Sequence, residues 1–156
     1  MGLDMYLKKE TYVGNEYRKP EQRVKVIQPV NEDGVYFPIK GKIIEERIST
    51  ITENVAYWRK DNAIHQWFVK NIQGGVDDCG KYYVPTEELE NLVNLCEELL
   101  INRDLELAKE KLPTQEGFFF GGIEYDEYYW NSLEETVKML KPLIEEEGDF
   151  YYQSSW

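Results

Sequence analysis

The spacing of hydrophobic residues changes halfway along this chain, and that change restricts the possible folds more than any other feature. Leu3, Met5 and Leu7 alternate with other residues, which is typical of a strand with one buried face. Later the spacing becomes helical, with a stripe formed by Leu89, Leu92, Val93, Cys96, Leu99 and Leu100. We therefore predict an α+β fold in which a short antiparallel sheet from the N-terminal half packs with three or four helices from the second half.

Turn signals divide the N-terminal half further. A second strand is predicted around residues 24–26, and Pro29 ends it. The turn signal at 31–34 precedes another predicted strand at 35–37. The pattern from 43 to 51 is ambiguous.

Helix-start and helix-stop signals define the second half. The predicted helices cover 53–72, 86–100, 104–111 and 132–144. The glycine pair 74–75 ends the first helix, and Thr86 is predicted to cap the second. Ser132 and Glu135 form a capping box for the last helix. The chain is predicted to return as a strand at 150–152.

The chain is acidic, with a net charge of -12 over 156 residues. Basic and acidic residues nearly balance up to residue 86, so the acidic excess lies in 87–156. This argues against direct binding to nucleic acid, which needs clustered Lys and Arg. It suits either a basic partner surface or solvated helix faces that keep the protein soluble. No repeat, low-complexity tract or linker interrupts residues 1–156, which we predict to form a single α+β domain.

Cysteine usage and the lack of targeting signals predict a cytoplasmic protein. Cys79 and Cys96 are too few for a disulfide scaffold, and the single histidine makes no zinc pattern with them. The N-terminal residues lack the basic and apolar regions of a signal peptide. No apolar run approaches the length of a membrane span, so we predict no membrane association. The sequence specifies neither a cofactor nor an oligomeric state.

The segment from 58 to 67 carries the first candidate binding residues. On a helix, Trp58, Asn62, His65 and Gln66 would share one face, with Arg59 beside it. An indole can stack on a flat ligand, and an amide and an imidazole can read its hydrogen-bonding edges. The alternative is structural, with Trp58 in the core and His65 bonded to a buried carbonyl.

Asp77 and Asp78 lie in a Gly-rich loop and form a second candidate. Adjacent carboxylates can hold a divalent cation, although a metal site usually needs further ligands. They can equally close the turn through local hydrogen bonds, and we favour this interpretation. We therefore predict no metal site.

The segment 112–130 is the most unusual of the chain. Three phenylalanines between glycines, at 118–120, predict a buried strand. Gln115 precedes them, and Tyr125 and Asp126 open an acidic, Tyr-rich stretch. Tyrosine offers a large contact area at low entropic cost, so we predict that these three residues contribute to ligand binding. Core packing with a surface loop is the alternative.

Several strings along the chain resemble a family of small uncharacterised proteins of phages, prophages and bacteria. The strings are the opening MGLDMYL, AYWRK at 56–60, NAIH with WFV at 62–69, VDDCG at 76–80, and LPTQ with GFFFGG and EYD at 112–126. The resemblance covers most of the chain, but residues 14–50 match nothing in it. The resemblance implies a phage association but no activity.

The favoured hypothesis is a non-enzymatic, phage-associated binding protein, with a possible role in counter-defence. It would sequester a nucleotide-like ligand. Trp58 would stack on the base, and Arg59 or Lys60 would bind the phosphate. The side chains that would form hydrogen bonds with the edges of the base are Asn62, His65 and Gln115. Alternatively, it would mask a basic site on a host protein with its carboxylates at 124, 126 and 127.

Two other functions rank lower. The second hypothesis is a structural or interaction module of a phage or host assembly. The third is a small metal-dependent hydrolase or transferase, with His65 as general base and Asp77, Asp78 or Asp126 holding the metal. No nucleophile elbow or HExxH motif supports catalysis, so no catalytic residue is predicted.

Overall fold

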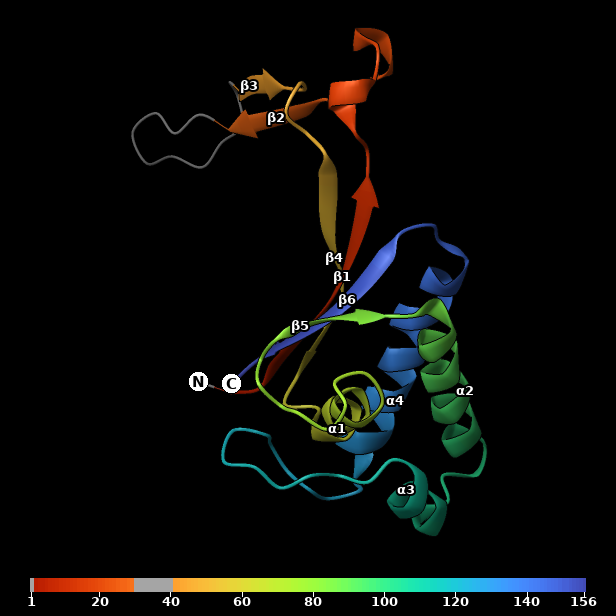
Figure 1. Cartoon of the computed structure of the whole chain (residues 1–156). Helices are drawn as coiled ribbons and strands as arrows, with labels where there is room; N and C mark the ends of the chain where they lie inside the picture. Colours follow the sequence, from red (N-terminus) through yellow and green to blue (C-terminus); the bar gives the residue numbers. More distant parts are fainter. Residues whose placement is uncertain (1, 30–40) are drawn as a thin grey trace. The chain divides into compact units, whose positions relative to one another are not determined.

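The computed structural model describes residues 2–29 and 41–156 (Figure 1). Contacts gather the chain into two compact units, a larger one of Met1–Lys9 and Glu53–Trp156 and a smaller one of Glu10–Thr52. The predicted α+β class is confirmed, with strands dominating the first part of the chain and helices following. That the chain folds as a single domain stays a prediction. The turn and strand predicted at 31–37 lie outside the described residues.

A four-stranded antiparallel sheet has the strand order β4-β1-β6-β5. Its strands are β1 (Asp4–Tyr12), β4 (Thr50–Arg59), β5 (Lys81–Val84) and β6 (Asp149–Ser155). The predicted N-terminal alternation is confirmed, because Leu3, Met5 and Leu7 are fully buried. The predicted C-terminal strand is confirmed as well, since β6 pairs with β5 and lies beside β1 (Figure 1). The first and last strands of the chain are therefore neighbours, and β4 is an edge strand.

Helices pack against this sheet and complete the core. They are α1 (Asn62–Asn71), α2 (Thr86–Asn102), α3 (Leu105–Lys111) and α4 (Glu127–Leu140), followed by the 3₁₀ turn η3 (Lys141–Glu145). α2 and α4 lie side by side (Figure 1). The stripe predicted for α2 is buried from Leu89 to Leu99, including Cys96. Between α1 and the sheet, Phe68 stacks on Tyr152 with 4.0 Å between ring centroids.

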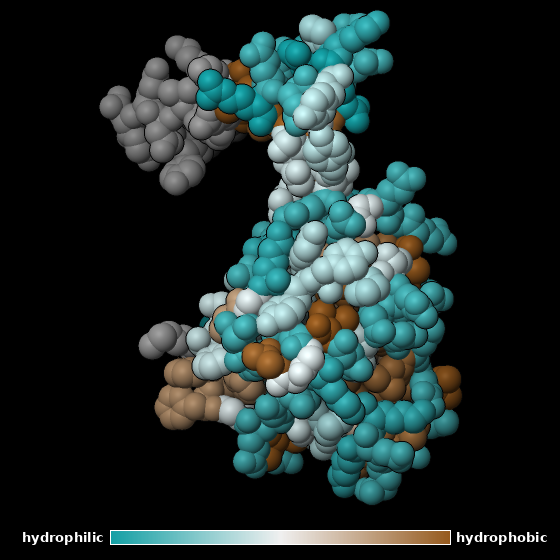
Figure 2. Space-filling view, in the orientation of Figure 1, coloured by the Kyte–Doolittle hydropathy of each residue, from teal (hydrophilic) through white to brown (hydrophobic). Residues whose placement is uncertain are grey.

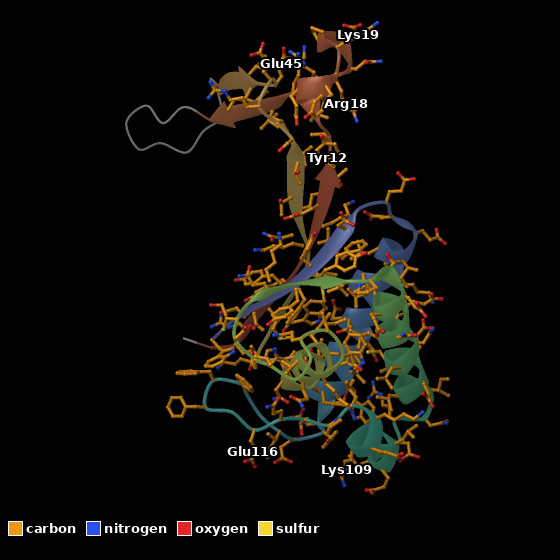
Figure 3. All side chains as sticks on the ribbon, in the orientation of Figure 1. Tyr12, Arg18, Lys19, Glu45, Lys109 and Glu116 are labelled. Atoms are coloured by element: carbon orange, nitrogen blue, oxygen red, sulfur yellow. The ribbon has the colours of Figure 1, made fainter. Side chains whose placement is uncertain are left out.

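The smaller unit is built around one buried amide. β2 (Val26–Pro29) pairs antiparallel with β3 (Gly41–Ile44), and the 3₁₀ turns η1 (Asn15–Tyr17) and η2 (Pro20–Gln22) precede them. The Asn15 side chain donates to the carbonyls of Val24 and Glu45 at 2.6 and 2.7 Å, and accepts from the Val24 amide. Charged side chains such as Arg18 and Lys19 lie on this unit (Figure 3). The strand predicted around 24–26 is confirmed, although it begins at Val26.

The helix predicted over 53–72 is wrong in its first part. Residues 50–59 form β4, and α1 begins only at Asn62. On β4, buried Ala56 and Trp58 alternate with more exposed Tyr57 and Arg59, which is the two-residue period of a strand. β-Branched and aromatic residues favour that conformation. Trp58 therefore does not share a helix face with Asn62 or His65.

Two predicted helix caps are also wrong. Thr86 is the first helical residue of α2 rather than its cap, which is Pro85. The Ser132 capping box does not exist, because α4 begins earlier, at Glu127. Asp126 caps it by accepting from the first-turn amides at 2.9 and 3.3 Å. The short helix predicted over 104–111 is confirmed as α3, with Asp104 as its cap.

The strand predicted at the three phenylalanines does not form. Residues 117–120 make a turn, in which Phe118 is 95% exposed and Phe120 alone is buried. Gly121 has a φ of +91°, which is incompatible with an extended strand at this position. The phenylalanine segment is therefore a surface loop with one residue in the core.

On the face shown in Figure 2, hydrophilic residues cover most of the larger unit and hydrophobic residues are scattered among them.

Candidate functional site

Trp58 is a core residue in its present surroundings. Its side chain is on β4, only 4% exposed, and its indole N–H donates to Thr136 Oγ1 at 2.8 Å. The ring also meets Phe68 edge to face. A stacking role for Trp58 would need a ring face that this packing covers, so the structural alternative agrees with its position.

Asn62 and Gln115 lie together, and the contact is structural. Asn62 Nδ2 donates to the carbonyls of Phe120 and Gly122 at 3.1 and 2.7 Å. Asn62 Oδ1 accepts from the Gln115 amide at 2.9 Å. The first residue of α1 thus holds the loop between α3 and α4 through three hydrogen bonds. Glu116, on the same loop, extends outward (Figure 3).

His65 is fully buried and both ring nitrogens have partners. Nε2 lies 2.9 Å from Asp77 Oδ2, and Nδ1 lies 2.7 Å from the Tyr152 hydroxyl. A carboxylate only accepts, so Nε2 donates to Asp77, while the Tyr152 hydroxyl occupies Nδ1. Trp156 Nε1 donates to the other Asp77 oxygen at 3.1 Å. This chain of bonds ties α1 to β6 and leaves no ring nitrogen free to act as a base.

The turn interpretation of Asp78 is confirmed. Asp78 accepts from the Gly80 amide at 2.8 Å and from the Tyr82 hydroxyl at 3.0 Å. In the part of the chain that the structure describes, no group of three His, Cys, Asp or Glu residues is placed to hold a metal ion.

The predicted residues after the phenylalanines also have structural partners. The Tyr125 hydroxyl accepts from the Thr114 amide at 3.1 Å, and Asp126 caps α4. Glu127 forms an ion pair with Arg103 at 3.1 Å. Two of the three carboxylates proposed to meet a basic partner are thus already engaged. Parts of the three predicted motifs do contact one another, since His65 bonds to Asp77 and meets Phe120 edge to face, but these contacts belong to the packed interior.

A groove at the end of β4 brings a different set of residues together. It has a volume of about 270 Å³ and lies where β4 and the start of α1 meet α4. We call it the Asp61 groove; its lining consists of Tyr57, Trp58, Arg59, Asp61, Tyr128, Asn131, Ser132, Glu135 and Met139. Of the predicted binding residues, Trp58 and Arg59 belong to it.

Asp61 contributes a buried carboxylate to this groove. It is only 6% exposed, and burial raises the pKa of its carboxyl from the ordinary 3.8 to about 6. Hydrogen bonds from the Ser132 hydroxyl and the Ile64 amide lower the pKa in part. No cation among the described residues pairs with this carboxylate. A buried carboxylate without a cation is uncommon, and it marks functional-site candidates.

Arg59 supplies the opposite charge in the same groove. Its side chain is exposed and has no carboxylate partner among residues 2–29 and 41–156. Elsewhere in this acidic chain many cations are paired, as Lys111 is with Glu98 and Lys141 is with Glu97. An unpaired guanidinium in a groove is suited to bind an anion.

Two tyrosines with anchored hydroxyls complete the lining. The Tyr128 hydroxyl donates to the Arg59 carbonyl at 2.6 Å, and the Tyr57 hydroxyl donates to Asp4. Their side chains remain 58% and 45% exposed. Each ring is therefore held in place from its polar end while keeping surface available for a flat ligand.

The backbone that carries Arg59 and Asp61 is constrained. Lys60, between them, has a φ of +55°, which is unusual for a residue with a side chain. A Cβ on Gly121 would lie 2.9 Å from the Lys60 carbonyl oxygen, so only glycine fits there. Constrained backbone of this kind is often found at functional sites.

Two other hollows are less suited to a charged ligand, one because of its lining and one because of its volume. A hollow of about 470 Å³ beside β6 is larger, and its lining includes Lys8, Cys79 and Gln153. There Lys8 already donates to Gln153 at 2.9 Å, and none of its lining residues is a buried charge. A crevice of about 10 Å³ on another side of Asp61 has room for about one water molecule.

Sequence reasoning missed Asp61 as a binding residue. A signal was present, since an aspartate directly before a helical pattern is a typical cap. Its burial and its contact with Ser132 depend on α4, which is distant in sequence, so the local pattern could not reveal them.

Comparisons with known proteins found no matching family model, no matching curated protein and no matching solved structure. None of the helices in the described residues has the length and apolar character needed to cross a membrane.

Proposed function

We propose that this protein binds a small nucleotide-like ligand in the Asp61 groove and does not transform it. The observation that carries the proposal is that two opposite charges, Asp61 and Arg59, lie in one groove and have no ion-pair partner among residues 2–29 and 41–156. A nucleotide has complementary parts, because its base offers N–H donors and its phosphate is an anion. The tyrosine rings at 57 and 128 offer surfaces on which a base can stack.

The energetic cost of Asp61 supports a binding role. A buried carboxylate without a cation destabilises the fold at neutral pH, because its charged form loses hydration. Buried charges with a strongly shifted pKa cluster at functional sites. A ligand that donates hydrogen bonds to Asp61 would offset this cost.

A binding role agrees better with the contacts than catalysis does. His65, the base of the alternative hydrolase, is enclosed between Asp77 and Tyr152. The groove holds two carboxylates, Asp61 and Glu135, and a serine, but no histidine. Sequestration of a nucleotide signal, with the phage association and counter-defence role inferred from sequence, is the biological form of the proposal.

The size of the groove limits the ligand. Pockets for drug-sized ligands usually measure about 300–1,000 Å³. At about 270 Å³ the Asp61 groove suits a mononucleotide, or one nucleotide unit of a larger molecule.

Titration calorimetry with purine and pyrimidine mononucleotides tests the proposal. Wild-type protein should bind at least one of them with one-to-one stoichiometry. Arg59→Ala should weaken that binding roughly 10- to 100-fold, which is the usual value of a charge-assisted hydrogen bond. The salt dependence of the affinity should fall at the same time, because one phosphate contact is lost.

Lys70→Ala is the matched control. Lys70 is an exposed cation on α1 outside the Asp61 groove, so its loss removes the same charge without touching the site. Equal weakening by both variants would indicate a general charge effect and contradict binding in the groove. Absence of binding to every mononucleotide would overturn the proposed function.

A further inference from the structure

We infer that the Asp61 groove selects guanine, through a pair of hydrogen bonds from the guanine edge to the Asp61 carboxylate. The inference rests on the proposed function and assigns the base that the site prefers. Three features of the groove support it: the acceptor capacity of Asp61, the position of Arg59 and the polar groups of α4.

Asp61 retains acceptor capacity that no described residue uses. An ionised carboxylate has about four acceptor positions and no donor. Ser132 and the Ile64 amide occupy two of them, and the Ile64 contact is long, at 3.4 Å. The remaining positions suit a ligand with two adjacent N–H donors, since two parallel bonds to one carboxylate are especially favourable.

Among the common bases, only guanine offers that pair. Its N1–H and N2–H₂ groups lie side by side and both donate. Adenine places an N6–H₂ donor beside the bare N1, whose lone pair would face the carboxylate. Cytosine has the same donor–acceptor conflict, and uracil has one N–H between two carbonyls. Hypoxanthine keeps the N1–H and lacks the N2 amino group, so it can make one of the two bonds.

The rest of the lining suits the rest of a guanine nucleotide. Asn131 carries an amide that can donate to the O6 carbonyl, and Arg59 can meet the phosphate. Glu135, the other carboxylate of the groove, is exposed and lies 3.5 Å from Lys138. It therefore competes little for the N–H donors of the ligand. Asp61 is the groove carboxylate that pairs with no cation in the described part of the chain.

The same chemistry has a second source. A guanidino acid such as arginine also combines a planar pair of N–H donors with an anionic group. It lacks a purine ring to stack on the tyrosines, so we expect guanine nucleotides to bind more tightly.

Calorimetry with GMP, IMP, AMP and L-arginine on the full-length protein tests the inference. GMP should bind at least about tenfold more tightly than AMP, with IMP between them. Asp61→Asn should remove most of this preference, because an amide presents only one acceptor. Asparagine is also a good helix cap, so this variant keeps the start of α1. Asp104→Asn makes the same substitution at the cap of α3, outside the groove, and should retain the preference.

Each outcome separates this inference from the proposed function. Equal affinity for GMP and AMP, lost in Arg59→Ala, would overturn guanine selection and leave nucleotide binding standing. A GMP preference that survives in Asp61→Asn would overturn the role of Asp61. Tighter binding of L-arginine than GMP, dependent on Asp61, would overturn guanine as the ligand. No binding of any nucleotide would overturn both proposals.

Discussion

Asp61 illustrates how one buried residue links stability to pH. Burial raises the pKa of its carboxyl to about 6, so the folded protein binds this proton more tightly than the unfolded chain does. The stabilising contribution of the bound proton is complete below the unfolded value of 3.8. It is lost as the pH rises through about 6. At neutral pH the charged carboxylate therefore lowers the free energy of unfolding.

Asp61→Asn should stabilise the protein at pH 7. An amide can accept from the Ile64 amide and bond to Ser132 without carrying a charge. At about 1.4 kcal/mol per pKa unit, the difference between 3.8 and 6 sets an upper limit of about 3 kcal/mol. The gain should vanish near pH 4, where both side chains are neutral. Urea unfolding at pH 4, 5, 6 and 7 measures it.

Asp104→Asn is the matched control for this prediction. Asp104 caps α3 from an exposed position, so the same substitution there should change stability little at pH 7. A loss of stability in Asp61→Asn at pH 7 would contradict the prediction. It would mean that the hydrogen bonds of the carboxylate outweigh the cost of its burial.

At the scale of elements, the start of α1 and the loop between α3 and α4 hold each other. Asn62 bonds to three backbone groups of that loop, and Gly121 packs against the Lys60 carbonyl. The loop therefore supports the backbone that positions Arg59 and Asp61. Disturbing the loop should affect both stability and the groove.

Gly121→Ala should destabilise the protein by about 1–3 kcal/mol. The added Cβ would lie 2.9 Å from the Lys60 oxygen, and the φ of +91° is unfavourable for alanine. Gly122→Ala is the adjacent control, since a Cβ there meets nothing within 4 Å. Its effect should stay within about 0.5 kcal/mol. Thermal and urea unfolding compare the two, and equal losses would refute the proposed close packing.

For the whole molecule, the two units differ in how many of their side chains are buried. In the smaller unit, the buried residues within the described part are Val13, Gly14 and Asn15, while Ile27 and Ile43 are exposed. The larger unit contains a continuous core of aliphatic and aromatic side chains. A two-stranded sheet with little buried surface has low stability by itself.

Amides of β2 and β3 should therefore exchange with solvent through local opening. Their protection should correspond to a smaller opening free energy than that of amides in α1 and α4. Hydrogen exchange at increasing low urea concentrations tests this, because only global unfolding has a steep urea dependence. Equal free energies and equal slopes in both units would contradict the prediction and favour a single cooperative domain.

The sequence by itself determined the features that depend on local spacing. The alternation at Leu3, Met5 and Leu7 predicted β1, and the helical stripe from Leu89 to Leu99 predicted α2. The fold class followed from these patterns, since each pattern allows only one buried face. The short helix α3 was predicted over 104–111 for the same reason, because the signals that start and stop a helix are neighbours in sequence.

Only the tertiary structure decided the rest. Residues 50–59 form a strand because β1 is available beside them; at its end the Lys60 amide donates to the Leu3 carbonyl at 2.8 Å. Asp61 is buried because α4 covers it and Ser132 bonds to it. Burial and pairing of this kind depend on residues far apart along the chain. No local pattern encodes the low dielectric that shifts the pKa of Asp61, which is why the groove emerged only from the folded structure.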